Sequence, residues 1–269
     1  MITSTSNVQI KELAKLQKKS RLRAEKGIFI VEGPRMTEEI PAERIEKLYV
    51  SESFGKKNPE FVKKMKVPAE VLTDTVFAYV SDTRTPQGVL AVVKRLNYTM
   101  EDILGMNETV GAADDEKKKA PHLVVLDNLQ DPGNLGTIFR TAEAAGVTGI
   151  LLSSDCVDVY NPKVIRSTMG AVFRMPFLYV EDLPKEIHKL QEKQIKVYAA
   201  HLDGKNAYDQ EDYTCGSAFL IGNEGNGLRD EVAECADCLI RIPMQGQAES
   251  LNAAVAAAVL MFEAARQRR

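Results

Sequence analysis

Three glycine-bearing polar segments in the C-terminal half of the chain each follow directly on a short apolar run. They begin after Leu126, after Ile221 and after Ile242. Short apolar runs bounded by glycine and polar residues are typical of buried strands. In an open α/β sheet, ligands bind beyond the carboxyl ends of the strands. The pattern therefore predicts an α/β domain in which three loops form one composite pocket.

The order of the elements in this half predicts a parallel sheet. A strand at 123–126, a polar loop at 128–136 and a helix at 137–145, ended by Gly146, lead into a second strand at 149–152. Glycine is common just past a helix end, and strands joined through a helix run parallel with a right-handed connection. Further strands are expected at 177–180, 195–200, 218–221 and 239–242, before a final helix from 251 to about 266.

The N-terminal half predicts a smaller α/β layer. Ser6 is expected to cap a helix whose buried side carries residues at helical spacing, namely Ile10, Leu13, Ala14 and Gln17. Strand-like runs alternate with helical or loop segments, and they cover 28–31, 47–50, 67–72 and 89–93.

Residues 106–120 (MNETVGAADDEKKKA) lack apolar periodicity and are interpreted as a linker. They divide the 269 residues into domains of 1–105 and 121–269, both of ordinary size. The longest apolar run, 253–262, is about half of what a membrane-spanning helix needs, and residues 1–11 lack an apolar signal-peptide core. We therefore expect a cytoplasmic protein that does not insert into a membrane.

Four cysteines are few for a disulfide framework, and in a chain without an export signal they are expected to be reduced. Cys235 and Cys238 form a C-x-x-C pair, which is compatible with a redox motif or with half of a zinc site. There is no second such pair and no H-x-x-x-H partner. Two packed small residues are the favoured interpretation, and no metal is predicted.

Charge is distributed unevenly along the chain. Residues 9–26 carry seven basic and two acidic residues, a local charge of +5, although the chain as a whole has a net charge of −3. A basic segment on an acidic protein is a candidate contact for a nucleic-acid backbone, because lysine and arginine neutralise phosphates. From charge alone, a solvated helix face remains the favoured alternative.

The first polar loop leads into a helix with two distinct faces. Arg140 shares one face with Thr137 and Ala144, and so it projects away from the core toward solvent, a partner or a phosphate. The free N–H groups at the start of this helix can bind an anion. The apolar stripe of the helix consists of Leu135, Ile138, Phe139, Ala142 and Ala145.

The other two loops match no common nucleotide-binding motif. Residues 222–227 (GNEGNG) hold three glycines but not the order G-x-G-x-x-G, and the chain has no phosphate-binding P-loop sequence. Residues 243–249 lead to Ser250, the predicted N-cap of the last helix. That helix is rich in alanine, which indicates that another backbone packs closely against it.

At these segments the sequence resembles the SpoU (TrmH-type) branch of the SPOUT RNA methyltransferases. Residues 134–142 (NLGTIFRTA) resemble the first motif of the family, and 221–228 (IGNEGNGL) resemble the second. Residues 242–244 (IPM) with 250–252 (SLN) resemble the third, so the resemblance covers 121–269. Residues 2–40, with 31–35 (VEGPR), resemble the ribosomal-protein-like substrate-binding domain that often precedes it.

The resemblance implies a trefoil-knotted α/β fold, a homodimer and an S-adenosylmethionine (AdoMet) cofactor bent within the knot. Threading a helix through its own domain would account for the small residues of the last helix. In the family, backbone groups make most of the cofactor contacts. Transferred to this sequence, the cofactor-binding positions are Gly222, Asn223, Gly225, Ile242, Pro243, Met244 and Leu251.

The implied reaction is methyl transfer to a ribose 2′-oxygen of RNA. Its catalytic candidates are Arg140, Asn134, Glu224, Ser250 and Asn252. Asn134 and Glu224 would orient the ribose, and Ser250 and Asn252 would complete the site. Arg140 would stabilise the developing alkoxide and contact phosphate, because a guanidinium group does not accept protons at ordinary pH.

RNA contacts are expected at Lys18, Lys19, Arg21 and Arg23, and also at Lys163 and Arg166. Ribosomal RNA is favoured over transfer RNA because of the resemblance of the N-terminal domain. The alternatives are a transfer-RNA methyltransferase and a non-catalytic RNA-binding or ribosome-assembly protein on the same fold. A Rossmann-type oxidoreductase and a Ser-His-Asp hydrolase are disfavoured, because their glycine-rich and G-x-S-x-G motifs are absent.

Overall fold

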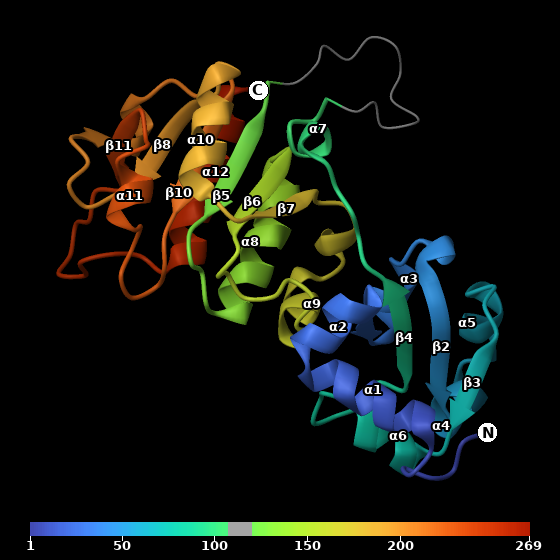
Figure 1. Cartoon of the computed structure of the whole chain (residues 1–269). Coiled ribbons are helices and arrows are strands. Elements are labelled where there is room, and N and C mark those ends of the chain that lie inside the picture. Colours follow the sequence, from blue (N-terminus) through green and yellow to red (C-terminus); the bar gives the residue numbers. More distant parts are fainter. Residues whose placement is uncertain (107–119) are drawn as a thin grey trace. The chain divides into compact units, whose positions relative to one another are not determined.

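A computed structural model describes residues 1–106 and 120–269 of the chain. It contains two compact units (Figure 1). Unit 1 consists of Met1–Asn97 together with Asp158–Phe173, and unit 2 consists of Tyr98–Val157 together with Arg174–Arg269. Most of the predicted linker at 106–120 lies outside the described residues. None of the described helices is long and apolar enough to cross a membrane.

Unit 1 is built on a four-stranded mixed sheet in the order β1-β4-β2-β3. The strand β4 runs antiparallel to β1 and β2, and β3 runs parallel to β2. All four were expected from apolar runs of β-branched and aromatic residues. Their bounds are β1 Ile28–Glu32, β2 Ile45–Ser51, β3 Ala69–Leu72 and β4 Val89–Lys94.

Helices α1 and α6 cover one face of this sheet. Ile10, Leu13 and Leu16 of α1 share a core with Val76 and Phe77 of α6. The N-cap of α1 is Asn7, not Ser6 as predicted, and its side chain accepts a hydrogen bond from the backbone of Gln9. The helices of this unit are α1 Val8–Lys18, α2 Ser20–Lys26, α3 Pro34–Glu38, α4 Glu52–Lys57, α5 Pro59–Lys64, α6 Asp74–Val80 and α9 Pro162–Thr168, with short 3-10 turns at Ala42–Arg44 and Ala171–Phe173.

A segment from the second half of the sequence completes unit 1. Residues 158–173 were assigned to the predicted domain 121–269, but they pack on β1. The ring of Phe29 lies 4.6 Å from that of Tyr160 and 6.3 Å from that of Phe173, measured between centroids. Tyr160 also accepts a hydrogen bond from the backbone N–H of Leu96 (2.9 Å). The alternation of side chains along β1 leaves Phe29 opposite the α1 face, where it needs this cover.

Unit 2 is an all-parallel sheet of seven strands in the order β7-β6-β5-β10-β8-β11-β9. From β5 the chain builds outward through β6 and β7, and the later strands lie on the other side. The strand order therefore reverses between β5 and β10, where an α/β sheet forms a crevice. The strands are β5 His122–Leu126, β6 Gly149–Ser153, β7 Phe177–Val180, β8 Lys196–Ala200, β9 Asn206–Ala207, β10 Ser217–Ile221 and β11 Cys238–Arg241.

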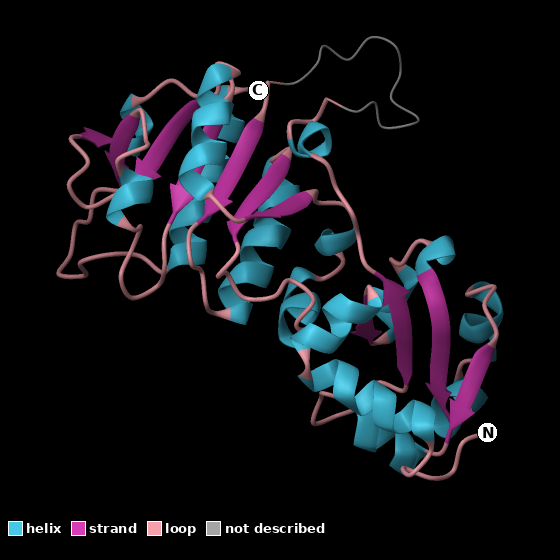
Figure 2. Cartoon of the chain, viewed as in Figure 1, coloured by secondary structure: helices cyan, strands magenta, loops and turns pink. Residues whose placement is uncertain are grey.

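Helices cover both faces of this sheet (Figure 2). On one face, α7, α10 and α11 share a core with alternate residues of β5, β8 and β10. On the other face, α12 packs against α8 and β10. The helices are α7 Met100–Ile103, α8 Pro132–Ala145, α10 Leu183–Glu192, α11 Asp230–Ala233 and α12 Ala253–Gln267, with a 3-10 turn at Tyr208–Gln210. The predicted α/β class, a parallel-sheet domain preceded by a small α/β unit, is confirmed; threading of the C-terminal helix stays a prediction.

Two helix starts differ from the prediction. The helix α8 begins at Pro132, within the predicted loop, because Asp131 caps it and proline fits the first turn. The helix α12 is capped by Asn252 and not by Ser250, with the Asn252 side chain accepting from the N–H groups of Ala254 and Val255. The apolar stripe predicted for α8 is buried, and Gly146 ends that helix in a left-handed conformation (φ 73°), both as expected.

The C-terminal end of the chain is anchored beside the first residue of β5. The guanidinium of Arg268 donates to the carbonyl groups of Tyr213 (2.7 Å), Ala120 (2.9 Å) and Pro121 (3.1 Å). His122 is buried nearby, and its Nε2 atom has no hydrogen-bond partner among the described residues. Burial, and secondarily the charge of Arg268, lowers the pKa of His122 to about 3.

We expect this histidine to make unit 2 less stable in mild acid. The folded chain binds the proton of His122 only near pH 3, but the unfolded chain binds it near pH 6.5. Stability from this group is therefore fully present above pH 6.5 and is lost as the pH falls, by roughly 2 kcal/mol at pH 5. Urea denaturation at pH 7 and pH 5 should show a smaller loss for His122→Phe than for wild type. The exposed His188, changed to asparagine, is the control, and equal losses in all three proteins would contradict the prediction.

Candidate functional site

The carboxyl ends of β5 and β10 lie side by side and begin two of the three predicted loops. The backbone N–H of Asp127, the first residue after β5, donates to the carbonyl of Ile221, the last residue of β10 (2.9 Å). The first loop (127–131) and the second loop (222–227) therefore leave the sheet at its switch point. The third loop (242–252) follows β11 and leads to α12.

Glu224 of the second loop is bound by the first loop. Its Oε1 atom accepts hydrogen bonds from the N–H of Asp131 (2.9 Å) and from Nδ2 of Asn134 (3.0 Å), and its Oε2 atom accepts from the N–H of Gln130 (3.2 Å). Burial alone would raise the pKa of Glu224, but these donors lower it below its ordinary value. Glu224 is therefore an ionised acceptor at neutral pH.

Asn134 connects this carboxylate to the third segment. Its Oδ1 atom accepts from Nδ2 of Asn252 (3.0 Å), and its Nδ2 atom donates to Glu224. The Oδ1 atom of Asn252 is meanwhile occupied by the first turn of α12. Both ends of the Asn134 amide are thereby used, which fixes its orientation. Three predicted site residues from three distant segments thus form one hydrogen-bonded chain.

The second loop is a tight turn closed by its own backbone. Asn223 and Gly227 exchange N–H to carbonyl hydrogen bonds of 2.8 and 3.0 Å. The Oδ1 atom of Asn223 accepts from the N–H of Gly225 (2.9 Å), and its Nδ2 atom donates to the carbonyl of Asn128 (2.8 Å) in the first loop. Gly222 lies against the backbone at the end of the turn, so that a Cβ atom there would be 2.1 Å from the carbonyl carbon of Gly227.

The predicted cofactor positions carry glycine, asparagine and apolar residues and no charged side chain. Ile242, Met244 and Leu251 are partly buried, and Pro243 is exposed. A Cβ atom at Gly246 would meet nothing within 4 Å. These residues fit a ligand that is held by backbone groups and apolar contacts. Ser250 is exposed and makes no hydrogen bond within the described part of the chain. It is therefore not part of the hydrogen-bonded series formed by Glu224, Asn134 and Asn252.

Arg140 lies apart from the three loops within a single chain. It is exposed on α8 beside Thr137 and Ala144, as predicted, and it has no polar contact with any described residue. It is six positions after Asn134, which corresponds to about 9 Å along a helix axis. The structure thus brings together Asn134, Glu224 and Asn252 but leaves Arg140 free to meet something outside the chain.

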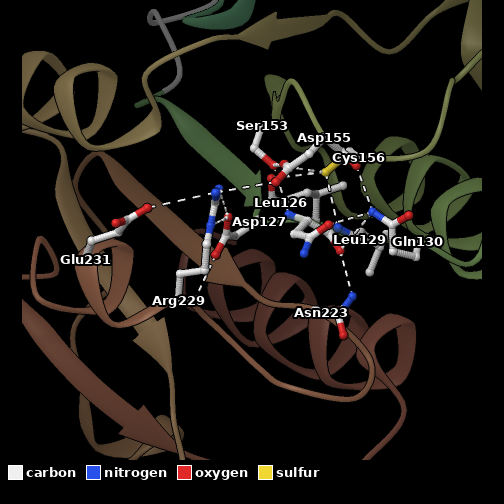
Figure 3. A network of polar contacts seen from close by, with 11 residues as sticks. Leu126, Asp127, Leu129, Gln130, Ser153, Asp155, Cys156, Asn223, Arg229 and Glu231 are labelled. Carbon is white, nitrogen blue, oxygen red and sulfur yellow. Dashed lines mark hydrogen bonds and ion pairs between the residues drawn. The ribbon is translucent and has the colours of Figure 1, made fainter.

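An ion pair behind the loops was not expected from the sequence (Figure 3). Asp127 is completely buried and accepts hydrogen bonds from both the backbone and the guanidinium of Arg229. The two residues are 102 positions apart. The sequence gives no local pattern that pairs Asp127, at the start of the first loop, with Arg229, which lies just after the second.

The basic residues predicted to bind RNA differ in how available they are. Lys18, Lys19 and Lys163 are exposed. Two others are engaged in ion pairs, Arg21 with Glu25 at 2.7 Å and Arg166 with Asp82 at 2.8 Å.

Arg23 does not belong to the predicted RNA-binding surface, because its side chain is buried. It is 2% exposed, pairs with Asp158 at 2.6 Å and donates to the carbonyl of Leu16 at 2.7 Å. Its predicted role in RNA binding is wrong, because the guanidinium fastens α2 to the 158–173 segment and is not presented to solvent.

The arrangement suits the orientation of a neutral polar ligand. It offers one ionised acceptor and two amides in a fixed chain, beside loops of accessible backbone. Among the residues described, no three His, Cys, Asp or Glu side chains lie close enough together to hold a metal ion.

Comparison with known proteins finds a matching model for each part of the chain. Residues 121–262 match the model of the SpoU rRNA Methylase family, and residues 7–91 match the MRM3-like substrate binding domain. The chain is 30% identical over 275 aligned residues to the 23S rRNA (guanosine(2553)-2′-O)-methyltransferase RlmP of Bacillus subtilis, covering 97% of each protein.

Two solved structures with bound AdoMet are similar over nearly the whole chain. The AdoMet-bound rRNA methyltransferase of Sinorhizobium meliloti has a TM-score of 0.82 and 30% identity, over 98% of this chain and 97% of that one. The SpoU methyltransferase AviRb of Streptomyces viridochromogenes, in complex with AdoMet, has a TM-score of 0.84 and 26% identity, over 97% and 98%. With both of its units matched and its three motifs joined at one sheet edge, the chain belongs to the SpoU rRNA methylase family.

Proposed function

We propose that this protein transfers the methyl group of AdoMet to a ribose 2′-hydroxyl of ribosomal RNA. The observation that carries the proposal is the hydrogen-bonded chain Glu224–Asn134–Asn252, which joins the three family motifs at the switch point of the sheet. Family membership and the names of the similar proteins support the same reaction and the same cofactor.

The chain's own residues have the task of alignment. AdoMet supplies a methyl group that is already activated on a sulfonium sulfur. Holding a hydroxyl in line with such a group is worth roughly 7–11 kcal/mol of the barrier. Glu224, as an ionised acceptor, and Asn134 would hold the ribose, and Asn252 keeps Asn134 in place. Backbone groups of Gly222, Ile242 and Leu251 would hold the cofactor, with Asn223, Gly225, Pro243 and Met244 beside them.

The position of Arg140 supports a site that is completed by a second copy of the chain. The helix α12 packs against α8 and exposes Val255 (49%) and Phe262 (44%), which are two turns apart on one side of α12. Burying this apolar surface in a homodimer would place a second copy of the chain against α12, the helix that packs on α8. Arg140 of one protomer would then stabilise the alkoxide that develops on the substrate ribose bound at the loops of the other protomer. Ser250 would contact the same substrate.

The test of the reaction is nucleoside mass spectrometry of ribosomal and transfer RNA from cells with and without the gene. We expect one 2′-O-methyl nucleoside to be lost from ribosomal RNA and to be restored by the purified protein with AdoMet. Its loss from transfer RNA alone would support the transfer-RNA alternative. An unchanged set of methylated nucleosides, with no AdoMet binding in calorimetry, would support the non-catalytic alternative.

Charge reversal at Lys18 and Lys19 is expected to weaken RNA binding. Both side chains are exposed, and neither is in an ion pair with a described residue. Losing two phosphate contacts should lower affinity by roughly tenfold or more and reduce the salt slope by about 1.4 for single-stranded RNA. Filter binding at several salt concentrations measures both quantities, and AdoMet affinity should not change.

The matched control for this prediction reverses Lys63 and Lys64 on α5, which gives the same change of net charge. If both double variants lose RNA affinity equally, the effect comes from net charge and not from a contact at 18–19.

A further inference from the structure

The Asp127–Arg229 ion pair lies beside the first and second loops, and the reaction described above makes no use of it (Figure 3). Asp127 is 0% exposed. Its Oδ2 atom accepts from the backbone N–H of Arg229 (2.9 Å), and its Oδ1 atom accepts from Nε of the same residue (2.8 Å) and also from a terminal guanidinium nitrogen. Burying a carboxylate costs free energy unless it is paired, so the fold is more stable when Arg229 stays next to Asp127.

The pair lies at the junction between the first and second loops. Asp127 is the first residue after β5, and Arg229 follows the second loop and is the N-cap residue of α11. The second loop is thus fastened to the first at three places: Asn223 to the carbonyl of Asn128, Glu224 to the N–H groups of 130–131, and Arg229 to Asp127. The first two contacts are made by residues of the exposed turn, whereas the third contains a fully buried group.

The geometry of the third contact favours a role in positioning. A guanidinium that donates from two of its nitrogens to one carboxylate sets direction as well as distance, which an ammonium group does not. The remaining nitrogen of Arg229 lies 3.4 Å from Asp155 and 3.8 Å from Glu231. Asp155 in turn bonds to Ser153, whose hydroxyl accepts from the N–H of Asn128 (2.8 Å). The network therefore leads back into the first loop.

We propose that Asp127 and Arg229 are a positioning pair that fixes the second loop against the first, and so sets both the affinity for AdoMet and the placement of Glu224. The inference rests on the proposed function, because it assigns the pair a part in that reaction. In this role the pair acts through Glu224 and the second loop, without contact to the substrate. Only the carboxylate of this pair is buried, because the Arg229 side chain is 41% exposed, and an ion pair by itself is weak evidence for stability. Apolar residues in place of the pair would not fix the orientation of the second loop, because they form no directional hydrogen bonds.

The experiment uses the full-length protein with three changes: Asp127→Asn, Arg229→Lys and the double variant Asp127→Asn/Arg229→Gln. Each single variant should bind AdoMet about ten- to a hundredfold more weakly in calorimetry, the size expected when one or two hydrogen bonds to the cofactor are lost. The rate at saturating AdoMet should fall as well, and RNA affinity should stay unchanged. The double variant replaces the ion pair with a neutral hydrogen-bonded pair, and it should recover part of the lost affinity.

Two further measurements separate positioning from general stability. Thermal unfolding shows that each variant is folded at the assay temperature, and Arg229→Lys is included because it keeps the positive charge and the backbone hydrogen bond to Asp127. Hydrogen exchange in the peptide 222–228 should rise in both single variants even in the absence of cofactor. Arg266→Met, which removes an exposed ion pair with Glu263 in the same unit, is the control and should change neither quantity.

The outcomes distinguish this inference from the proposed function. If the wild type neither binds AdoMet nor methylates RNA, the proposed function fails, and hydrogen exchange in the second loop still tests the pair. If the wild type is active and the folded variants keep wild-type AdoMet affinity and exchange, the pair is merely structural and the inference is overturned. A lower melting temperature with unchanged AdoMet affinity has the same meaning.

Discussion

Replacing Gly222 with alanine is expected to abolish AdoMet binding while the chain stays folded. The added Cβ would lie 2.1 Å from the carbonyl carbon of Gly227 and 2.2 Å from the backbone nitrogen of Leu228. Both neighbours are backbone atoms, so the turn itself must move. Overpacking of this kind typically costs about 1–3 kcal/mol, which a domain of this size tolerates. The second loop, however, would lose its shape, and if it holds the cofactor as proposed, AdoMet affinity should fall by about a hundredfold or more in calorimetry.

A glycine-to-alanine change elsewhere provides the control. At Gly55 in α4, a Cβ would meet only Cγ2 of Val50, at 3.6 Å, an ordinary contact. Gly55→Ala should bind AdoMet as the wild type does. Circular dichroism establishes that both variants are folded. Wild-type AdoMet affinity in Gly222→Ala would show that the second loop does not form the cofactor site.

Arg140→Ala should eliminate turnover and leave AdoMet affinity within a factor of about two. The side chain is exposed and has no contact with described residues, so its removal should not disturb the fold. If it stabilises the charge that develops on the ribose oxygen, its loss should lower kcat by about a hundred- to a thousandfold, as for other groups with that role. Single-turnover methylation with labelled AdoMet measures the rate, and Arg269→Ala is a matched exposed control.

Mixing two inactive variants tests whether Arg140 acts across a dimer. If each site takes Arg140 from one protomer and Glu224 from the other, a mixed dimer of Arg140→Ala and Glu224→Ala has one site that lacks both side chains. Its other site keeps both and is intact. An equal mixture should then regain about a quarter of wild-type activity. No recovery, in a mixture shown to exchange subunits, would place Arg140 and Glu224 of one chain in the same site.

Local patterns predicted much of the fold. Apolar runs between glycine and polar residues located the main strands of both sheets, because burial on a sheet requires that composition. The stripe on α8 was equally clear. The caps were less so: Ser250 and Asn252 are both good N-caps, and in the fold Asn252 caps α12 while its Nδ2 atom also donates to Asn134.

Long-range pairings between charged residues were the part that the sequence does not reveal. Arg23 is 135 residues from Asp158, and Arg229 is 102 residues from Asp127. In a sequence each of these arginines has the properties of a surface residue. Each of them is paired with a carboxylate that another part of the fold supplies, and only Arg23 is buried. The three loops, by contrast, could be predicted to meet because each directly follows a strand of one sheet.

The excursion of 158–173 into unit 1 means that the two halves of the gene do not encode two self-sufficient proteins. A fragment that ends at residue 105 would expose the Phe29 side of its sheet to water, since Tyr160 and Phe173 would be missing. It would also hold Arg23 without Asp158 as its counter-ion. Recombination that separates the halves would therefore have to move this short insert together with the N-terminal half. Exchanging substrate-binding units between relatives would need one crossover at the linker and two more at the ends of the insert.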